Sequence, residues 1–319
     1  MERKIARFDT RSAPALRRPV ARHILAVMLA LATWCGGAGT ATAQDADAAQ
    51  EGVHVGKMSA LRKLVPEEQL EASATQQYTS MKQQAAQQKA LGPDSHPQVQ
   101  RLRAIAARLV PHALRWNPRA SEWHWEVNLI GSKEVNAFCM PGGKIAFYTG
   151  LLQGLQLTDD EAAIVMGHEI AHALREHGRE RAAKSSLANA GAKLAGLGLA
   201  AVLGIDPHLT TAATGLGANL TMLKFSRDDE TEADVVGLDI AARAGYDPRA
   251  GVALWQKMAK VSQNAPPQWL SSHPAGQNRI AEMQKQLPAV MPLYARAKGL
   301  SQQSLPPYHS NVKGIAPVS

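Results

Sequence analysis

His168, Glu169 and His172 form the string H-E-I-A-H, whose residue types and spacing suit metal-assisted hydrolysis. Residues four apart on a helix lie one turn above each other, so two imidazoles at this spacing can bind one Zn²⁺. Glu169 then faces the side where a zinc hydrolase keeps a coordination position open for water. The string therefore predicts a zinc peptidase site, provided that it lies on a helix.

The residues around the string have the features of a helix. Thr158 precedes three acidic residues, which is typical of an N-terminal cap with an acidic first turn, and residues 162–174 have helical apolar spacing. The pattern predicts a helix that continues beyond His172, past His177, to about Ala183. The alternative interpretation is a pair of partly buried histidines that make hydrogen bonds in the core.

A catalytic zinc ion has three protein ligands, so the two histidines need a third partner. The acidic segment 226–234 offers one, because Glu230 and Asp234 are four apart on an expected helix. Glu230 could reach the metal while Asp234 accepts a hydrogen bond from a ligand imidazole. On spacing alone, Asp228 and Glu232 are also candidates for the third zinc ligand. The acids could also be a charged first turn that the helix dipole favours.

Two other ligand sets do not match this chain. A metzincin-type extension requires Gly and His at two positions where this chain has Arg175 and Gly178, so His177 is not expected to bind the metal. The downstream Glu of thermolysin-like enzymes is missing from the Ala-rich segment that follows Arg181.

The combined motifs resemble those of a known family. The string at 168–172, the pattern S-R-x-x-E-x-x-A-D-x-x-G at 226–237 and G-Y-D-P at 245–248 are similar to the HtpX-like and CAAX prenyl protease type I zinc metallopeptidases. The likeness is greatest to soluble periplasmic bacterial members and covers about residues 61–287. It implies a gluzincin, with a zincin-like metallopeptidase domain of the α+β class that is mostly α. The long membrane helices of the prenyl protease members are absent, so a prenylated substrate is not implied.

The resemblance implies a role for each residue of the motifs. His168, His172 and Glu230 would bind one Zn²⁺ per chain, and Asp234 would be the carboxylate behind the ligands. Glu169 would be the general base that later passes a proton to the leaving amine.

His273-Pro274, with Arg279 six residues after the His, matches a further motif of the family. The resemblance places both side chains near the metal. There they could stabilise the oxyanion, or His273 could occupy the open zinc position in a self-restrained state. The alternative is a solvent-exposed loop histidine.

A small antiparallel sheet is expected before the metal helix. Residues 123–129 alternate apolar and polar side chains, and residues 137–148 have the pattern of a hairpin around P-G-G. The resemblance makes part of this hairpin an edge strand that would hold an extended substrate peptide by main-chain bonds. Its substrate-binding residues would be Asn136, Ala137, Phe138, Gly142 and Gly143. A purely structural hairpin is the alternative, and Cys139 in this strand is either a redox position or a small buried residue.

Helical patterns flank the sheet and the metal helix. They predict helices at 66–91, 97–114, 228–244, 249–261 and 276–287. The Gly-, Ala- and Leu-rich segment 187–205 is expected to be an apolar helical hairpin that packs on the protein or contacts a membrane surface. Asn189 and Lys193 would be costly at bilayer depth, which argues against a span.

Length and composition suit a soluble globular protein, since 45% of the 319 residues are hydrophobic. The net charge of +8 falls to +3 without residues 1–43, which contain seven basic and two acidic residues. No basic patch is interleaved with aromatic residues, so no nucleic-acid partner is expected.

Residues 1–43 have the three parts of a secretory signal: a basic lead, an apolar run at 24–34 and A-T-A before Gln44. The run is too short to span a bilayer, so a cleavable signal peptide and a periplasmic location are predicted. Cys35 follows the apolar run, so attachment of a lipid to this cysteine is an open alternative. Cleavage after residue 43 would leave Cys139 as the one cysteine, which excludes an internal disulfide.

The expected organisation is a signal peptide at 1–43, a flexible leader at 44–60, the metallopeptidase domain with its N-terminal helices at 61–290 and a poorly ordered tail at 291–319. These features predict a zinc endopeptidase that acts on unfolded or misassembled polypeptides of the bacterial cell envelope. The alternative is a chaperone or assembly factor with a gated or vestigial metal site, against which the intact Glu169 argues. A structural zinc site is disfavoured, because three ligands leave the coordination open.

Overall fold

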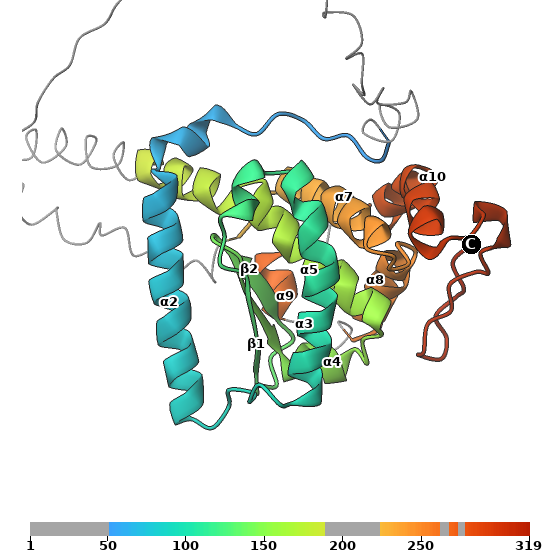
Figure 1. Cartoon of the computed structure of the whole chain (residues 1–319), viewed down its shortest axis with the longest axis horizontal. Helices are drawn as coiled ribbons and strands as arrows, with labels where there is room; N and C mark the ends of the chain where they lie inside the picture. Colours follow the sequence, from blue (N-terminus) through green and yellow to red (C-terminus); the bar gives the residue numbers. More distant parts are fainter. Residues whose placement is uncertain (1–50, 189–223, 262–267, 274–277) are drawn as a thin grey trace, which may run out of the picture. The chain divides into compact units, whose positions relative to one another are not determined.

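The computed structural model describes residues 51–188, 224–261, 268–273 and 278–319 (Figure 1). Its helices are α2 (Glu67–Gln87), α3 (Pro97–Leu109), α4 (Thr149–Gly154), α5 (Asp159–Leu174), α7 (Arg227–Arg243), α8 (Ala250–Val261), α9 (Gln268–Ser272) and α10 (Arg279–Lys298), with short 3₁₀ helices at Ala60–Leu64, Val110–Arg115, Pro118–Ser121 and Gln302–Ser304. Its strands are β1 (Glu126–Ile130), β2 (Ala137–Met140) and β3 (Lys144–Tyr148). The predicted class, mostly α with a small sheet, is confirmed.

Parts of the predictions fall outside the described residues. These parts are the signal peptide and all but the first two residues of the apolar segment 187–205. None of the helices in the described ranges combines the length and the apolar character that a membrane span requires.

The sheet has three strands in the order β1-β3-β2. β2 and β3 form the predicted antiparallel hairpin, with Phe138 opposite Ala146. β1 instead runs parallel to β3, with Val127 opposite Ile145. The prediction of an antiparallel sheet is therefore wrong, because the sheet is mixed. An alternating pattern shows which side chains are buried, but it carries no information on the direction of the neighbouring strand.

The sheet packs between α2 on one face and the helices α3 and α5 on the other (Figure 1). α2 buries one side, which includes Ala74 and Tyr78, and the Tyr78 hydroxyl donates to the carbonyl of Ile145. On the other face, Ile145 and Phe147 belong to the same buried cluster as the apolar residues of α5. The metal helix is thus fixed against this face of the sheet, mostly beside the edge strand β2.

α5 begins as predicted but ends earlier. A capping box joins Thr158 and Glu161, each side chain bonding the backbone N–H of the other. The helix ends at Leu174, and Glu176 has φ +56° before a new helix starts at residue 177. The predicted single helix to Ala183 is therefore wrong. The left-handed residue turns the chain, which the apolar periodicity of the two helical pieces does not reveal.

The metal helix and α7 meet through two glycines. A Cβ on Gly167 would lie 2.9 Å from the Gly237 carbonyl oxygen, and a Cβ on Gly237 would lie 2.8 Å from the His168 backbone nitrogen. The absence of both side chains lets the two backbones approach closely. This contact sets the distance between the two histidines of α5 and the acids of α7.

Gly237→Ala should push α7 away from α5. The new Cβ would overlap backbone atoms of Gly167 and His168, which cannot shift without their helix. Overpacking of this kind costs roughly 1–3 kcal/mol, and it would move Glu230 out of register with the histidines. We expect a lower urea midpoint and weaker zinc binding in chelator competition. Gly154→Ala is the matched control, because its nearest neighbour would be 3.8 Å away; equal effects of the two substitutions would contradict this packing.

α10 is longer than predicted. It runs through Pro288 and Pro292 to Lys298, where Gly299 ends it with φ +66°. The prolines suggested an end at Leu287, because each removes a backbone donor from the helix. The helix continues because its apolar side, which includes Val290 at 0% exposure, is buried in the main core.

The tail after α10 is not poorly ordered, so this prediction is wrong. Tyr308 and Val318 form an antiparallel bridge with two backbone hydrogen bonds of 2.8 and 3.0 Å. The Tyr308 hydroxyl lies 3.0 Å from the Thr158 hydroxyl at the start of α5. Burial of the two apolar side chains holds the tail, whereas its proline-containing composition suggested disorder.

Residues 51–60 of the predicted flexible leader also pack against the domain. Val53 is 2% exposed, and its N–H donates to Asp239 at 3.3 Å. Gly52 has φ +113°, and a Cβ there would lie 2.2 Å from the same carboxylate. The buried acid that holds this segment lies far along the chain, so the local composition did not reveal it. The prediction is wrong for these residues.

Candidate metal centre and active site

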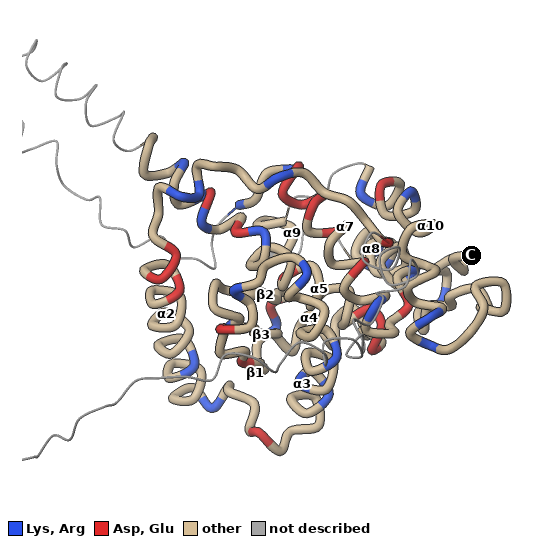
Figure 2. The backbone as a smooth tube through the Cα atoms, turned by 45° about the horizontal axis from the view of Figure 1, so that its top comes forward, with Lys and Arg blue, Asp and Glu red and all other residues tan. Residues whose placement is uncertain are grey.

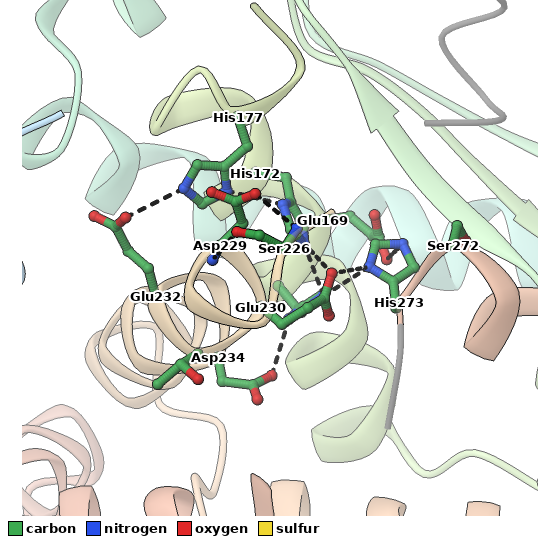
Figure 3. A network of polar contacts seen from close by, with 12 residues as sticks. Glu169, His172, His177, Ser226, Asp229, Glu230, Glu232, Asp234, Ser272 and His273 are labelled. Atoms are coloured by element: carbon green, nitrogen blue, oxygen red, sulfur yellow. Dashed lines mark hydrogen bonds and ion pairs between the residues drawn. The ribbon is translucent and has the colours of Figure 1, made fainter. Parts of the chain in front are cut away.

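Four side chains bring donor atoms together at one point. His168 and His172 come from α5, Glu230 from α7 and His273 from the residue after α9. Their donor atoms all lie within 4.8 Å of one another, and no side chain is more than 3% exposed. Figure 3 shows the Glu230 carboxylate between His172 and His273. The Glu230 oxygens lie 3.5 Å from His168 Nε2 and 3.4 Å from His172 Nε2.

The surrounding hydrogen bonds determine which ring nitrogens of His168 and His172 carry a proton. His168 Nδ1 lies 2.9 Å from Asp234, so this nitrogen donates. His172 Nδ1 lies 2.9 Å from His177 Nδ1, and the other ring nitrogen of His177 lies 3.3 Å from Glu232. The His177 proton is directed to Glu232, so His177 Nδ1 accepts the proton of His172 Nδ1, while His168 Nδ1 donates its proton to Asp234. The Nε2 atoms of His168 and His172 are therefore both unprotonated, and they lie 3.1 Å apart. Two adjacent lone pairs with a carboxylate fit a shared cation, and the donor set is one that Zn²⁺ prefers.

The pKa values of the donors agree with this role. Burial lowers the pKa of His172 well below its usual value, although the nearby negative charge of Glu230 opposes the shift. Burial alone would raise the pKa of Glu230, but the neighbouring imidazoles of His172 and His273 outweigh it and hold this pKa well below its usual value. Neutral imidazoles beside an ionised carboxylate are the protonation state that metal binding requires.

Arg279 holds the two acids of α7 that face the site. Its Nε donates to Asp234 at 2.7 Å, and its Nη1 donates to Glu230 at 2.7 Å. The remaining nitrogen, Nη2, donates to the other oxygen of Asp234. The guanidinium carbon also lies 4.1 Å from the ring centroid of Trp255. Carboxylates therefore engage all three nitrogens, so Arg279 positions Glu230 and Asp234.

The three acids that competed on spacing alone have different surroundings. Asp228 is exposed. Glu232 accepts hydrogen bonds from Arg175 and His177, on the side away from the cluster (Figure 3). Glu230 alone of the three contributes an oxygen to the cluster.

The support of His172 by His177 was not anticipated from the sequence. Residues five apart do not face each other on a continuous helix, and the two rings meet because Glu176 is left-handed. The ring of Phe225 stacks on the other side of His172, with centroids 4.0 Å apart and planes at 26°. No spacing rule marks either partner.

His177→Ala should weaken zinc binding without removing a ligand. The substitution deletes the acceptor that fixes the proton on His172 Nδ1, and partners of this kind are worth roughly 10- to 100-fold in metal affinity. Competition with a zinc chelator measures the effect. The exposed His309→Ala is the control, and equal affinities of the two variants would show that His177 does not orient the ligand.

Glu169 lies beside the cluster but is not one of its four donors. The indole Nε1 of Trp269 in α9 donates to Glu169 Oε1 at 2.7 Å, and His273 Nε2 lies 3.6 Å from the same oxygen. Trp269 is 1% exposed and has no sequence pattern that would have identified it. The carboxylate is therefore held at the edge of the cluster by a side chain more than ninety positions away in the sequence.

His273 is buried, so the alternative of a solvent-exposed loop histidine is wrong. Its Nδ1 lies 2.9 Å from Glu230 and its Nε2 faces Glu169. Burial opposes protonation of this ring, but Glu169 and Glu230 outweigh it and raise the pKa of His273.

β2 is an edge strand of the described sheet, and only part of it is open. The Asn136 carbonyl accepts the Tyr148 N–H at 3.1 Å, so the alternation of an antiparallel pair directs the main-chain groups of Ala137 and Cys139 away from β3. The Val135 carbonyl on that side already accepts the Trp269 N–H at 3.0 Å. Two residues therefore present their main chain at this edge.

The other expected substrate residues have structural surroundings. Phe138 packs against Tyr78, with ring centroids 6.4 Å apart. Gly142 and Gly143 form the turn with φ +80° and +76°, and a Cβ on Gly143 would lie 2.8 Å from Trp125. The turn thus needs glycine for its backbone conformation, which favours the structural interpretation for these positions.

Cys139 is partly buried in β2. Burial, assisted by the charge of Glu169, raises the pKa of its thiol well above the usual value. Because the thiolate is the reactive form, the structure favours a small packed residue over a redox position.

Known proteins are similar in sequence to this chain. The profile of peptidase family M48 matches residues 96–287. The mitochondrial metalloendopeptidase OMA1 of Arabidopsis thaliana is 39% identical over 155 residues, which cover 49% of this chain and 30% of the relative. OMA1 of Bos taurus is 34% identical over 197 residues, with 57% and 37% covered. The beta-barrel assembly-enhancing protease of Escherichia coli K12 is 29% identical over 206 residues, with 62% and 40% covered.

The chain thus spans less than half the length of these three curated relatives. The family profile nevertheless matches more than half of the chain, including all three segments that build the metal cluster. The expected resemblance to zinc metallopeptidases is confirmed. The chain belongs to peptidase family M48 and contains a zinc metallopeptidase domain.

Proposed function

We propose that this protein is an endopeptidase that hydrolyses peptide bonds in unfolded or misassembled proteins of the bacterial cell envelope. The observation that carries the proposal is the Glu169 carboxylate, held beside a buried cluster of His168, His172 and Glu230. The relatives are named metalloendopeptidases, and the Escherichia coli relative is named for its part in beta-barrel assembly. These names support the class of substrate.

In the proposed mechanism, His168, His172 and Glu230 hold one Zn²⁺, which when bound would activate water and polarise the scissile carbonyl. Glu169 takes the proton of the attacking water and delivers it to the leaving amine. The bond from Trp269 engages Oε1 of Glu169, so we assign that proton to Oε2, which has no hydrogen-bond partner among the described residues.

The neighbouring residues keep these groups in place. Asp234 and His177 fix the rings of the two ligand histidines, and Arg279 fixes both carboxylates of α7. We assign His273 to the stabilisation of negative charge on the substrate, because it is a buried donor beside Glu169. A substrate peptide would lie extended along the open edge of β2.

We expect the purified chain to bind one zinc ion per molecule and to need it for cleavage of unfolded casein. Chelation should abolish cleavage because the cluster supplies no other source of activated water, and added zinc should restore it whereas magnesium should not. Metal analysis and fragment release on gels measure the two quantities. Full cleavage by zinc-free protein would refute the proposed mechanism.

A chaperone or assembly factor is the second candidate. The observation that favours it is the burial of His273 within the donor cluster, where its ring could take the coordination position that a catalytic site keeps for water. In this case zinc would stabilise a binding protein, and a variant without the general base would support envelope assembly as well as the wild type. Complementation of a deletion strain distinguishes the two.

We further propose export to the periplasm after cleavage behind residue 43, with peripheral membrane contact through residues 187–205. Leu187, which is 50% exposed, is the described part of this segment that supports the contact. Cell fractionation and N-terminal sequencing of the mature chain test the location and the cleavage site. Full-length protein confined to the cytoplasm would contradict the proposal.

A further inference from the structure

A pocket that is partly open to solvent lies beside the metal cluster, and both apolar and charged side chains line it. It forms where the N-terminal end of α2 meets the end of β2 and the segment that follows α5. His172 and the Phe225 ring stacked on it form the wall next to the metal cluster. Leu70, Trp123 and Met140 provide much of the apolar surface opposite.

The pocket is continuous with the open edge of β2. Cys139 lines the pocket and also presents its main-chain groups at that edge. Successive side chains of an extended peptide point to opposite sides of its backbone, so a peptide paired there would direct alternate side chains towards the pocket. We propose that the pocket receives one large apolar side chain of the substrate, next to the scissile bond. This assignment rests on the proposed endopeptidase function.

The charged groups of the lining are already paired. Glu67 lies 2.8 Å from Arg119 and 3.3 Å from Arg179, and Glu176 lies 2.5 Å from Arg62 and 3.1 Å from Arg179. Basic residues lie just before α2, and acidic residues occupy its first turns (Figure 2). In the part of the chain that the structure describes, a charged substrate side chain would therefore find no unpaired opposite charge. It would lose its hydration, whereas an apolar side chain gains from burial.

Two further details favour an apolar occupant. Burial, helped by a hydrogen bond with Glu176, raises the pKa of Glu67 to about 7, which reduces its charge near neutral pH. Glu71 is held by a 2.9 Å hydrogen bond from the Trp123 indole, so the polar edge of this aromatic side chain is occupied and its remaining surface is apolar.

The wall formed by α2 lies outside the residues that match the family profile. That match begins at residue 96, whereas α2 ends at Gln87. Leu70 is 9% exposed and packs with Val65 and Ala182 beside the segment after α5. The preference of the pocket for a substrate side chain is thus set partly by α2, which precedes the matched region. A substitution of Leu70 should therefore change this preference.

The test uses full-length, zinc-loaded protein and fluorogenic peptides that carry Phe, Leu, Ala, Lys or Asp at each position around the cleaved bond. Wild type should prefer Phe or Leu at one of these positions. Leu70→Trp fills the pocket and should lower kcat/KM for the preferred peptide by at least ~10-fold while leaving its Ala counterpart nearly unchanged. Leu64→Trp is the matched control, because Leu64 is 59% exposed and does not line the pocket.

Leu70→Ala gives a second readout in case the larger residue disturbs folding. It should widen the pocket and shift the preference towards Trp at the same position, with unchanged zinc content. Zinc-dependent cleavage without an apolar preference, or an equal loss on all peptides in both Leu70 variants, would overturn the pocket assignment and leave the proposed function intact. Absence of zinc-dependent cleavage of every peptide and of unfolded casein by wild type would overturn both.

Discussion

Glu169→Gln should abolish nearly all cleavage while the protein remains folded and zinc-loaded. Gln has the same shape and can still accept the hydrogen bond from the Trp269 indole, so the surroundings of the site are preserved. It cannot take a proton from water at neutral pH, and loss of a general base costs roughly 10²- to 10⁴-fold in rate. We expect kcat/KM to fall by this factor, with little change in KM.

The control for this variant is Glu282→Gln on α10, which removes one exposed carboxylate paired only at 3.8 Å with Lys285. It should match wild type in every assay. Zinc content and thermal midpoint show whether the Glu169 variant keeps its metal and its fold. Residual activity above one tenth of wild type would mean that another group acts as the base. Equal complementation by the variant and wild type would favour the assembly-factor function.

Arg279→Met should be the most destabilising of the site substitutions. Arg279 is 5% exposed and bonds the carboxylates of Asp234 and Glu230 at once. Its removal leaves two buried negative charges facing each other without their shared partner. Breaking a buried ion pair from one side costs about 3–5 kcal/mol, and the cost should be largest in zinc-free protein, where no cation offsets the charge.

Urea unfolding with and without chelator measures this effect. The expected result is a fall of about 3–5 kcal/mol in the unfolding free energy of the chelated variant, with a smaller fall when zinc is bound. Arg296→Met on the same helix is the control, since this arginine is 58% exposed and its pair with Glu51 should contribute less than about 1 kcal/mol. Similar losses for the two variants would show that the buried pairs do not stabilise the fold.

Local signals in the sequence were sufficient for several features. The H-E-I-A-H string, the capping residue Thr158 and the helical spacing after it correctly placed the metal helix. The hairpin of β2 and β3 followed from two apolar runs around a glycine turn. α7 ended at Arg243, one residue before the predicted Ala244 and two before Gly245. Each depends on residues close together along the chain, where side-chain periodicity and backbone preference are visible directly.

Other features depended on partners that are distant in the sequence. Spacing left three acids of α7 as candidates, and only the packing of Gly237 on Gly167 brings one of them to the α5 histidines. The leader and the tail were expected to be loose, yet each packs on residues more than 140 positions away. Their composition is polar or proline-containing, and only the partner surface makes their order favourable.

The sequence by itself determined the chemistry, because the types and local spacing of His168, Glu169 and His172 already specify a metal-binding helix with a base beside it. The tertiary structure decided how this chemistry is held. It brought His177, Trp269 and Arg279 to the site and set the parallel pairing of β1 with β3. These contacts arise where helices and strands pack against one another. The periodicity of one element shows which of its faces is buried, but not which side chain of a distant segment will contact that face.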